Sequence, residues 1–117
     1  MIGRGAEDDA KRLRCEVTEG ARSARLALHG EFDIDSAESA TCALQELLGR
    51  DLDAVVVDLS RLDFMDSSGV KFLVDARGEA HQLGIKLSLV YGGDPVRRVL
   101  TVSGVTALFE EPEEPAR

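Results

Sequence analysis

The residues whose side chains are best suited to take part in chemistry lie together at Asp66-Ser67-Ser68-Gly69. Before them, the apolar β-branched run Val55-Val56-Val57 predicts a buried strand. After them, apolar residues recur at helical spacing, so the four residues lie where a strand leads into a helix N-terminus. Backbone N–H groups without an intrahelical partner collect there. A serine in that place either caps the helix or presents a modifiable hydroxyl at the surface.

Hydrolysis by these serines would need a general base, and the chain has only two histidines. His29 is out of phase with the apolar positions of its predicted strand, and His81 falls in the middle of the helix that follows the serines. A nucleophile and its base must lie within hydrogen-bond reach, and the sequence has no G-x-S-x-G elbow. These features argue against a serine hydrolase.

Motifs for phosphate cradles and metal sites are missing. There is no G-x-x-x-x-G-K-[ST], and Gly92-Gly93 is typical of a turn. Asp33 and Asp66 could together hold magnesium, but acidic residues at loop tips are more often solvated. Cys15 and Cys42 lack C-x-x-C spacing, and we expect buried thiols in a reducing cytosol. We therefore expect no cofactor and no metal.

Composition indicates a single acidic domain. The chain has 117 residues, 14 basic and 22 acidic, for a formal net charge of −8. One tyrosine, four phenylalanines, no tryptophan and no basic cluster argue against nucleic acid. The same charge argues against anionic membrane surfaces. No apolar run approaches the roughly 20 residues that span a bilayer, and the N-terminus lacks a signal peptide's apolar region. We expect a cytoplasmic protein without membrane insertion.

The first half predicts a hairpin and a helix. Two alternating segments, separated by the Glu19-Gly20 turn, form antiparallel strands. Their inward residues are Leu13, Cys15 and Val17, then Ala24, Leu26 and Leu28. Residues 30–33 then leave the sheet. A helix over 36–48 follows, with Asp35 as its cap, Glu38 completing a capping box, and Gly49 at its end. Its apolar stripe is Ala37, Ala40, Leu44, Leu47 and Leu48.

The second half predicts two strand–helix units. A strand over 54–58 precedes the Asp66–Gly69 loop and a helix that ends at Gly84. That helix should bury Val70, Leu73, Val74, Ala80 and Leu83, and Gly78 within it costs about 1 kcal/mol against alanine without an evident reason. A strand over 85–91 is followed by a helix with Asp94 as cap and Pro95 first. Its inward residues are Val96, Val99 and Leu100, and Ser103-Gly104 closes it. Residues 105–109 would add a short edge strand or an extended arm.

These elements predict an α/β fold in a single domain over residues 11–109. The sheet is mixed and four- to five-stranded, with an opening β-hairpin. Crossovers between parallel strands are nearly always right-handed, so if the second, third and fourth strands lie side by side in that order, the helices fall mainly on one face. We expect residues 1–10 to form a flexible tail and residues 110–117 a disordered acidic tail.

The stretch Leu62–Val70 resembles the signature loop of the STAS domain, found in bacterial anti-sigma factor antagonists. Gly30-Glu31-Phe32-Asp33 resembles that family's second hallmark. By this resemblance Ser67 corresponds to the phosphoacceptor, and Asp33 and Asp66 to the acidic positions beside it. Ser68 is then the expected helix cap, and Gly69 would let the backbone approach a partner closely. The expected partner-binding residues are Asp33, Asp66, Ser67, Ser68 and Gly69.

The resemblance implies a regulatory protein and not an enzyme. Unmodified, it would bind an anti-sigma factor serine kinase and so free a sigma factor. Phosphorylation of Ser67 would release the kinase, and a serine phosphatase would reverse the modification. A monomer or weak homodimer is expected.

Two alternatives remain open from the sequence. One is a STAS subunit of a stress-signalling scaffold or transport complex. The other is a phosphoaspartate receiver, since Asp58 and Asp66 follow a buried strand. Receivers carry an acidic pair after their first strand and a lysine after their last. Here Asp33 is single and Lys86 begins a strand, and the opening hairpin also differs from the receiver order.

Overall fold

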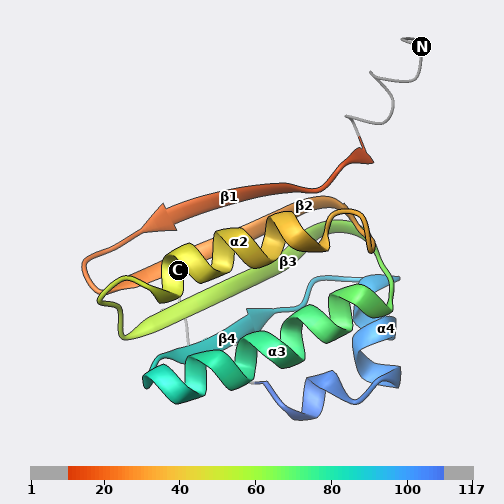
Figure 1. The fold of residues 1–117 in the computed structure, drawn as a ribbon. Helices are drawn as coiled ribbons and strands as arrows, with labels where there is room; N and C mark the ends of the chain where they lie inside the picture. Colours follow the sequence, from red (N-terminus) through yellow and green to blue (C-terminus); the bar gives the residue numbers. More distant parts are fainter. Residues whose placement is uncertain (1–10, 110–117) are drawn as a thin grey trace, which may run out of the picture.

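The computed structural model describes residues 11–109. Along the chain it has the following elements (Figure 1): β1 (Arg14–Glu19), β2 (Ser23–Phe32), α2 (Ala37–Leu48), β3 (Ala54–Met65), α3 (Ser67–Leu83), β4 (Lys86–Val90), α4 (Val96–Val102) and the 3-10 turn η1 (Val105–Ala107).

The four strands form one mixed sheet in the order β1-β2-β3-β4. β1 and β2 are antiparallel, and the other neighbouring pairs are parallel. The predicted α/β fold with its opening hairpin is thus confirmed. The prediction of a further strand or extended arm over 105–109 was wrong, because the chain turns at Gly104 (φ +83°) into η1, which buries Val105.

The core lies between the sheet and its helices. Figure 1 shows α2 and α3 across the same face of the sheet, as the predicted order of strands and helices requires. Fully buried side chains come from all of these layers, including Leu26, Leu28, Leu44, Leu73 and Leu89. The opposite face carries polar and charged side chains, among them the Arg25–Asp58 ion pair.

β3 is longer than its hydrophobic pattern predicts. It continues beyond Asp58 to Met65, and its second half pairs with β2 as far as Phe32. The prediction that residues 30–33 leave the sheet was therefore wrong for residues 30–32. Two register shifts each place one extra β3 residue in the ladder. As a result Leu59, Leu62 and Met65 are buried at intervals of three residues. A search for alternation with a period of two residues therefore does not detect this half of the strand.

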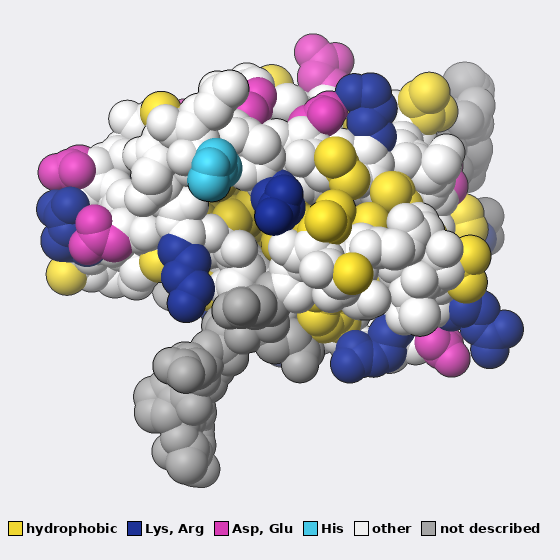
Figure 2. Space-filling model, turned by 90° about the horizontal axis from the view of Figure 1, so that it is seen from below, with side chains coloured by type: hydrophobic (Ala, Val, Ile, Leu, Met, Phe, Trp, Pro, Cys, Tyr) yellow, Lys and Arg dark blue, Asp and Glu magenta, His cyan; other side chains and the backbone are white. Residues whose placement is uncertain are grey.

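α3 buries a different face from the predicted one. Its buried residues are Gly69, Phe72, Leu73, Ala76 and Ala80. Val74 and Leu83, expected inside, are 43% and 58% exposed. Figure 2, which views the molecule from below, shows hydrophobic side chains among the polar ones on this surface. The predicted end at Gly84 is confirmed by its left-handed φ of 74°, and a Cβ at Gly78 would meet nothing within 4 Å.

Local polar chemistry at the other helix ends differs from the predictions. The N-cap of α2 is Ser36 and not Asp35, and its side chain makes no cap hydrogen bond, so the capping box does not form. Gly49 ends α2 with a right-handed φ of −81°. α4 has Pro95 and not Asp94 as its N-cap.

The thiols also depart from expectation. Cys42 is exposed on the outer side of α2, so the expectation of a buried thiol was wrong there. Cys15 is partly buried, and desolvation raises the pKa of its thiol.

Candidate functional site

The two sequence motifs meet where β2 and β3 end. The carboxyl ends of adjacent parallel strands lie at the same sheet edge, and the last residue pair is Phe32 with Met65. The ladder extends one step further, because the Asp66 N–H donates to the Phe32 carbonyl at 3.1 Å. The loops that carry Asp33 and Asp66 are therefore held side by side.

Asp66 is the N-cap of α3. Its backbone is extended, and its Oδ1 accepts from the Ser68 N–H at 2.9 Å. The Ser68 hydroxyl also donates to this oxygen. The prediction of Ser68 as the cap was wrong, because a cap residue precedes the first helical turn and accepts from N–H groups within it. Ser68 is the second residue of α3 and serves as a donor to the cap.

Ser67 is the first residue of α3 and is exposed. Among residues 11–109 its hydroxyl has no hydrogen-bond partner, whereas the Ser68 hydroxyl is partly buried and bonded to Asp66. The two neighbouring serines are thus chemically distinct. Of these two serines, only Ser67 offers an exposed hydroxyl without a hydrogen bond.

Gly69 has a reason for being glycine within the fold. It is buried, and a Cβ there would lie 2.4 Å from Cγ and 2.8 Å from Sδ of Met65. Met65 is itself only 2% exposed, so it has little room to move away. Gly69 therefore allows the first turn of α3 to pack directly on the end of β3.

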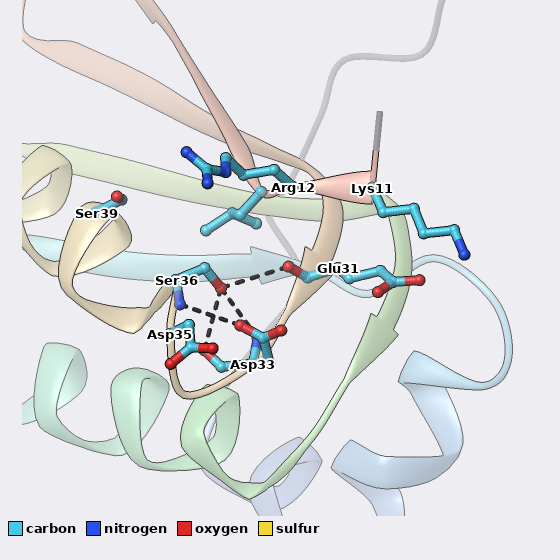
Figure 3. Close-up of a pocket in the computed structure, with 8 residues that line it drawn as sticks. Lys11, Arg12, Glu31, Asp33, Asp35, Ser36 and Ser39 are labelled. Carbon is cyan, nitrogen blue, oxygen red and sulfur yellow. Dashed lines mark hydrogen bonds between the residues drawn. The ribbon is translucent and has the colours of Figure 1, made fainter. Parts of the chain in front are cut away.

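Asp33 shapes the turn that begins α2 (Figure 3). Its N–H donates to Ser36 Oγ at 3.0 Å, and the Ser36 N–H donates to Asp33 Oδ1 at 3.1 Å. The Ser36 hydroxyl additionally lies 3.1 Å from the Asp33 carbonyl. Ser36 was not among the predicted site residues. An aspartate and a serine three residues apart before a helix was the signal for it, because both side chains bond readily to nearby backbone.

Backbone and aromatic packing hold this loop in place. Gly30 has a φ of +96°, and a Cβ there would lie 2.6 Å from the Arg12 carbonyl oxygen. Only glycine tolerates that combination. Two residues later, the Phe32 ring packs against Phe72 of α3 with centroids 5.3 Å apart. The Gly-Glu-Phe-Asp motif therefore connects the Asp33 turn to α3.

A polar cavity of about 410 Å³ adjoins the Asp33 turn. Figure 3 shows its lining residues: Lys11, Arg12, Leu13, Glu31, Asp33, Asp35, Ser36 and Ser39. Ser67 does not line it. Within residues 11–109 no group of three or more metal-ligating side chains is suitably arranged for a metal ion.

Neither histidine is placed as a base for Ser67. His29 Nε2 lies 3.0 Å from Glu16 Oε1 on the sheet, and His81 is in the last turn of α3. With a rise of about 1.5 Å per helical residue, His81 is roughly 20 Å from Ser67. No histidine therefore lies in place to activate the Ser67 hydroxyl.

Asp58 is held in an ion pair within β3 and does not lie at the strand's end. Its Oδ2 accepts from Arg25 at 2.9 Å, and its Oδ1 accepts from the Ser60 N–H at 2.9 Å and the Ser60 hydroxyl at 2.6 Å. Burial disfavours the charged form, but these hydrogen bonds outweigh it and lower the pKa of Asp58. Its place and partners do not favour a phosphoaspartate receiver.

A model of the STAS domain family matches residues 13–115, nearly the whole chain. The anti-sigma-F factor antagonist RsfB of Mycobacterium tuberculosis is 31% identical over 84 residues, covering 72% of this chain and 68% of RsfB.

Solved structures agree in fold. An anti-sigma factor antagonist from Mycobacterium paratuberculosis superposes with a TM-score of 0.79 at 22% identity, covering 88% of each chain. Bacillus SpoIIAA is also an anti-sigma factor antagonist. Its unphosphorylated form superposes with a TM-score of 0.73 at 22% identity, covering 86% of this chain and 90% of SpoIIAA. Its phosphorylated form superposes with a TM-score of 0.66 at 21% identity, covering 86% of this chain and 93% of SpoIIAA. Within residues 11–109 no helix is long and apolar enough to cross a membrane. The chain belongs to the STAS domain family, and its relatives named here are anti-sigma factor antagonists.

Proposed function

We propose that this protein is an anti-sigma factor antagonist that acts in the cytoplasm. It binds an anti-sigma factor kinase while Ser67 is unmodified and releases it when Ser67 is phosphorylated. The observation that carries the proposal is the exposed, unbonded Ser67 hydroxyl beside the Asp66 cap, with Ser68 already engaged. The names of the similar proteins support the same role.

Phosphorylation at this position is compatible with the fold but unfavourable at an interface. A phosphate adds about −1.5 to −2 charges. At the first residue of α3 the helix dipole favours that charge by about 0.3–1 kcal/mol. Like charges juxtaposed across an interface cost several kcal/mol. Asp66 and the neighbouring Asp33 loop add negative charge on this side. Repulsion between the phosphate and an acidic group of a docked partner would therefore exceed the favourable contribution of the helix dipole.

The modifying activities are assigned to other proteins. The sequence has no phosphate-cradling motif for ATP, so the kinase acts on Ser67 in trans. A separate serine phosphatase restores the free hydroxyl. The proposed role of this chain is regulated binding.

The proposal is tested by calorimetric titration of Ser67→Ala and Ser67→Asp against the purified anti-sigma factor. Ser67→Ala should bind as the parent does, because no hydrogen bond is lost. Ser67→Asp should bind at least about tenfold more weakly, equivalent to about 1.4 kcal/mol. Gln82→Glu adds the same charge to an exposed position at the far end of α3 and should change little. Equal affinities of Ser67→Asp and the parent would refute the switch.

Labelling separates the two serines. With the kinase and ATP, mass spectrometry should find one phosphate on the parent and on Ser68→Ala, and none on Ser67→Ala. Labelling that survives in Ser67→Ala and disappears in Ser68→Ala would reverse the assignment. A phosphate lost in mild base would indicate an acyl phosphate and contradict phosphoserine.

A further inference from the structure

The exposed side of α3 carries a lysine one turn from Ser67. Ser67, Lys71 and Asp75 recur at four-residue intervals, and side chains four residues apart are neighbours on one helix face. The Lys71 and Asp75 side chains are 77% and 57% exposed. The Lys71 ammonium donates to Asp75 Oδ2 at 2.7 Å. Lys71 therefore lies on the Ser67 side of the helix, paired with an acid on its C-terminal side.

We propose that Lys71 is an internal ligand for a phosphate on Ser67, which it binds in exchange for Asp75. The inference rests on the proposed phosphorylation of Ser67 and names the group within the chain that responds to it. The site it describes is a lysine ammonium paired with a phosphate monoester on the preceding turn of the same helix.

The order of charges along α3 favours this exchange. An acid four residues before a lysine stabilises a helix more than an acid four residues after it. Lys71–Asp75 has the weaker order, and phosphorylated Ser67 with Lys71 has the stronger. The Cα–Cβ bonds of a helix also tilt toward its N-terminus, so the preceding turn, which carries Ser67, lies within the usual reach of a lysine side chain. The phosphate offers three acceptor oxygens and more charge than the Asp75 carboxylate.

The surrounding charges make a cation useful at this place. Asp66 lies directly beside Ser67, and the Asp33 loop is held next to it. The carboxylates of Asp66 and Asp33 oppose a phosphate by like-charge repulsion. The hydrogen bond and charge of Asp75 raise the pKa of Lys71. The ordinary pKa of a lysine already lies far above neutral pH, so the ammonium keeps its charge with either partner. By offsetting part of the phosphate charge, Lys71 limits how strongly phosphorylation weakens partner binding.

The test is a ³¹P NMR titration of full-length protein in which phosphoserine is incorporated at position 67 during synthesis. It is independent of any kinase or partner, so failure of the proposed function does not affect it. The second pKa of phosphoserine is about 6, and a nearby cation lowers it. Lys71→Gln should raise it by about 0.2–0.4 units relative to the parent.

Further variants separate the exchange from a general charge effect. Lys71→Arg should leave the second pKa of the phosphoserine at the parent value. Asp75→Asn should lower this pKa slightly, because it removes the carboxylate that competes with the phosphate for Lys71. Lys86→Gln removes an exposed lysine at the start of β4, the opposite end of the sheet, and should leave it unchanged. The Lys71→Gln difference should shrink in 1 M NaCl, where the Debye length is about 3 Å. A Lys71→Gln value within about 0.1 units of the parent, or an equal shift in Lys86→Gln, would refute the proposal.

Discussion

Ser67 and Ser68 show how one residue of displacement changes the chemistry of a side chain. At the second position of α3, the Ser68 N–H and hydroxyl both reach the Asp66 carboxylate. At the first position, the Ser67 side chain lies at the surface without such a partner. The neighbouring residues therefore have different roles: Asp66 and Ser68 form the hydrogen bonds that begin the helix, and Ser67 remains accessible to another protein.

Gly69 provides the test at this scale. Gly69→Ala should destabilise the fold by about 1–3 kcal/mol, because the new Cβ overlaps the enclosed Met65 side chain. Urea unfolding measures this change. Introduced into Met65→Ala, the same substitution should cost at least about 0.5 kcal/mol less, because the overlapping atoms are gone. Additive costs in the double variant would mean that Gly69 is required for some other reason.

At the scale of elements, α3 connects the candidate site to the core. Its first turn rests on Met65, Phe72 packs against Phe32, and Leu73 is completely buried. Movement at the N-terminus of α3 would thus disturb contacts with both β2 and β3. This packing explains why the Asp33 and Asp66 loops are positioned together.

The orientation of α3 can be checked with two adjacent residues. Leu73→Ala should lower the free energy of unfolding by about 2–5 kcal/mol, the usual cost of emptying a buried leucine site. Val74→Ala, at a position 43% exposed, should change it by less than about 0.5 kcal/mol apart from helix propensity. Chemical denaturation of both variants gives the comparison. Similar losses at the two positions would mean that α3 buries the face expected from its sequence.

Across the whole molecule, ion pairs join segments that are distant in sequence. Arg22 in the β1–β2 turn bonds to Asp51 and Asp53 before β3, and Arg25 on β2 pairs with Asp58 on β3. The Asp58 group is the less exposed of these acids, with 14% of its side chain accessible. We therefore expect Asp58 to contribute to the acid sensitivity of the folded chain.

The pH dependence follows from the lowered pKa of Asp58. Its stabilising contribution is present above its ordinary pKa of 3.8 and is lost as pH falls through the lower folded value. Asp58→Asn should lower the free energy of unfolding by about 1–3 kcal/mol at pH 7. The difference in unfolding free energy between this variant and the parent should become smaller below about pH 4. Urea unfolding from pH 7 to pH 3 measures this, with the exposed Asp63→Asn as the matched control. A constant deficit across that range would exclude Asp58 as a source of acid sensitivity.

The sequence by itself determined the order of the elements from β1 to α4, the opening hairpin and the strand-to-helix placement of Asp66–Gly69. These depend on local patterns: alternation along β2, the β-branched start of β3, and the glycine that ends α3 at Gly84. Such signals are short-range, because side-chain periodicity follows directly from helix and strand geometry. The STAS resemblance lies in the same local stretches.

Tertiary structure decided the rest. The two register shifts in β3 depend on its pairing with β2, so the burial of Leu62 and Met65 did not follow from period-two alternation. The inward face of α3 was set by Phe32 and Met65, residues on other elements. The choice of Asp66 over Ser68 as the cap depended on where β3 ended. Each of these outcomes depends on a contact between segments that are distant in the sequence. The periodicity within one segment does not show which other segment packs against it.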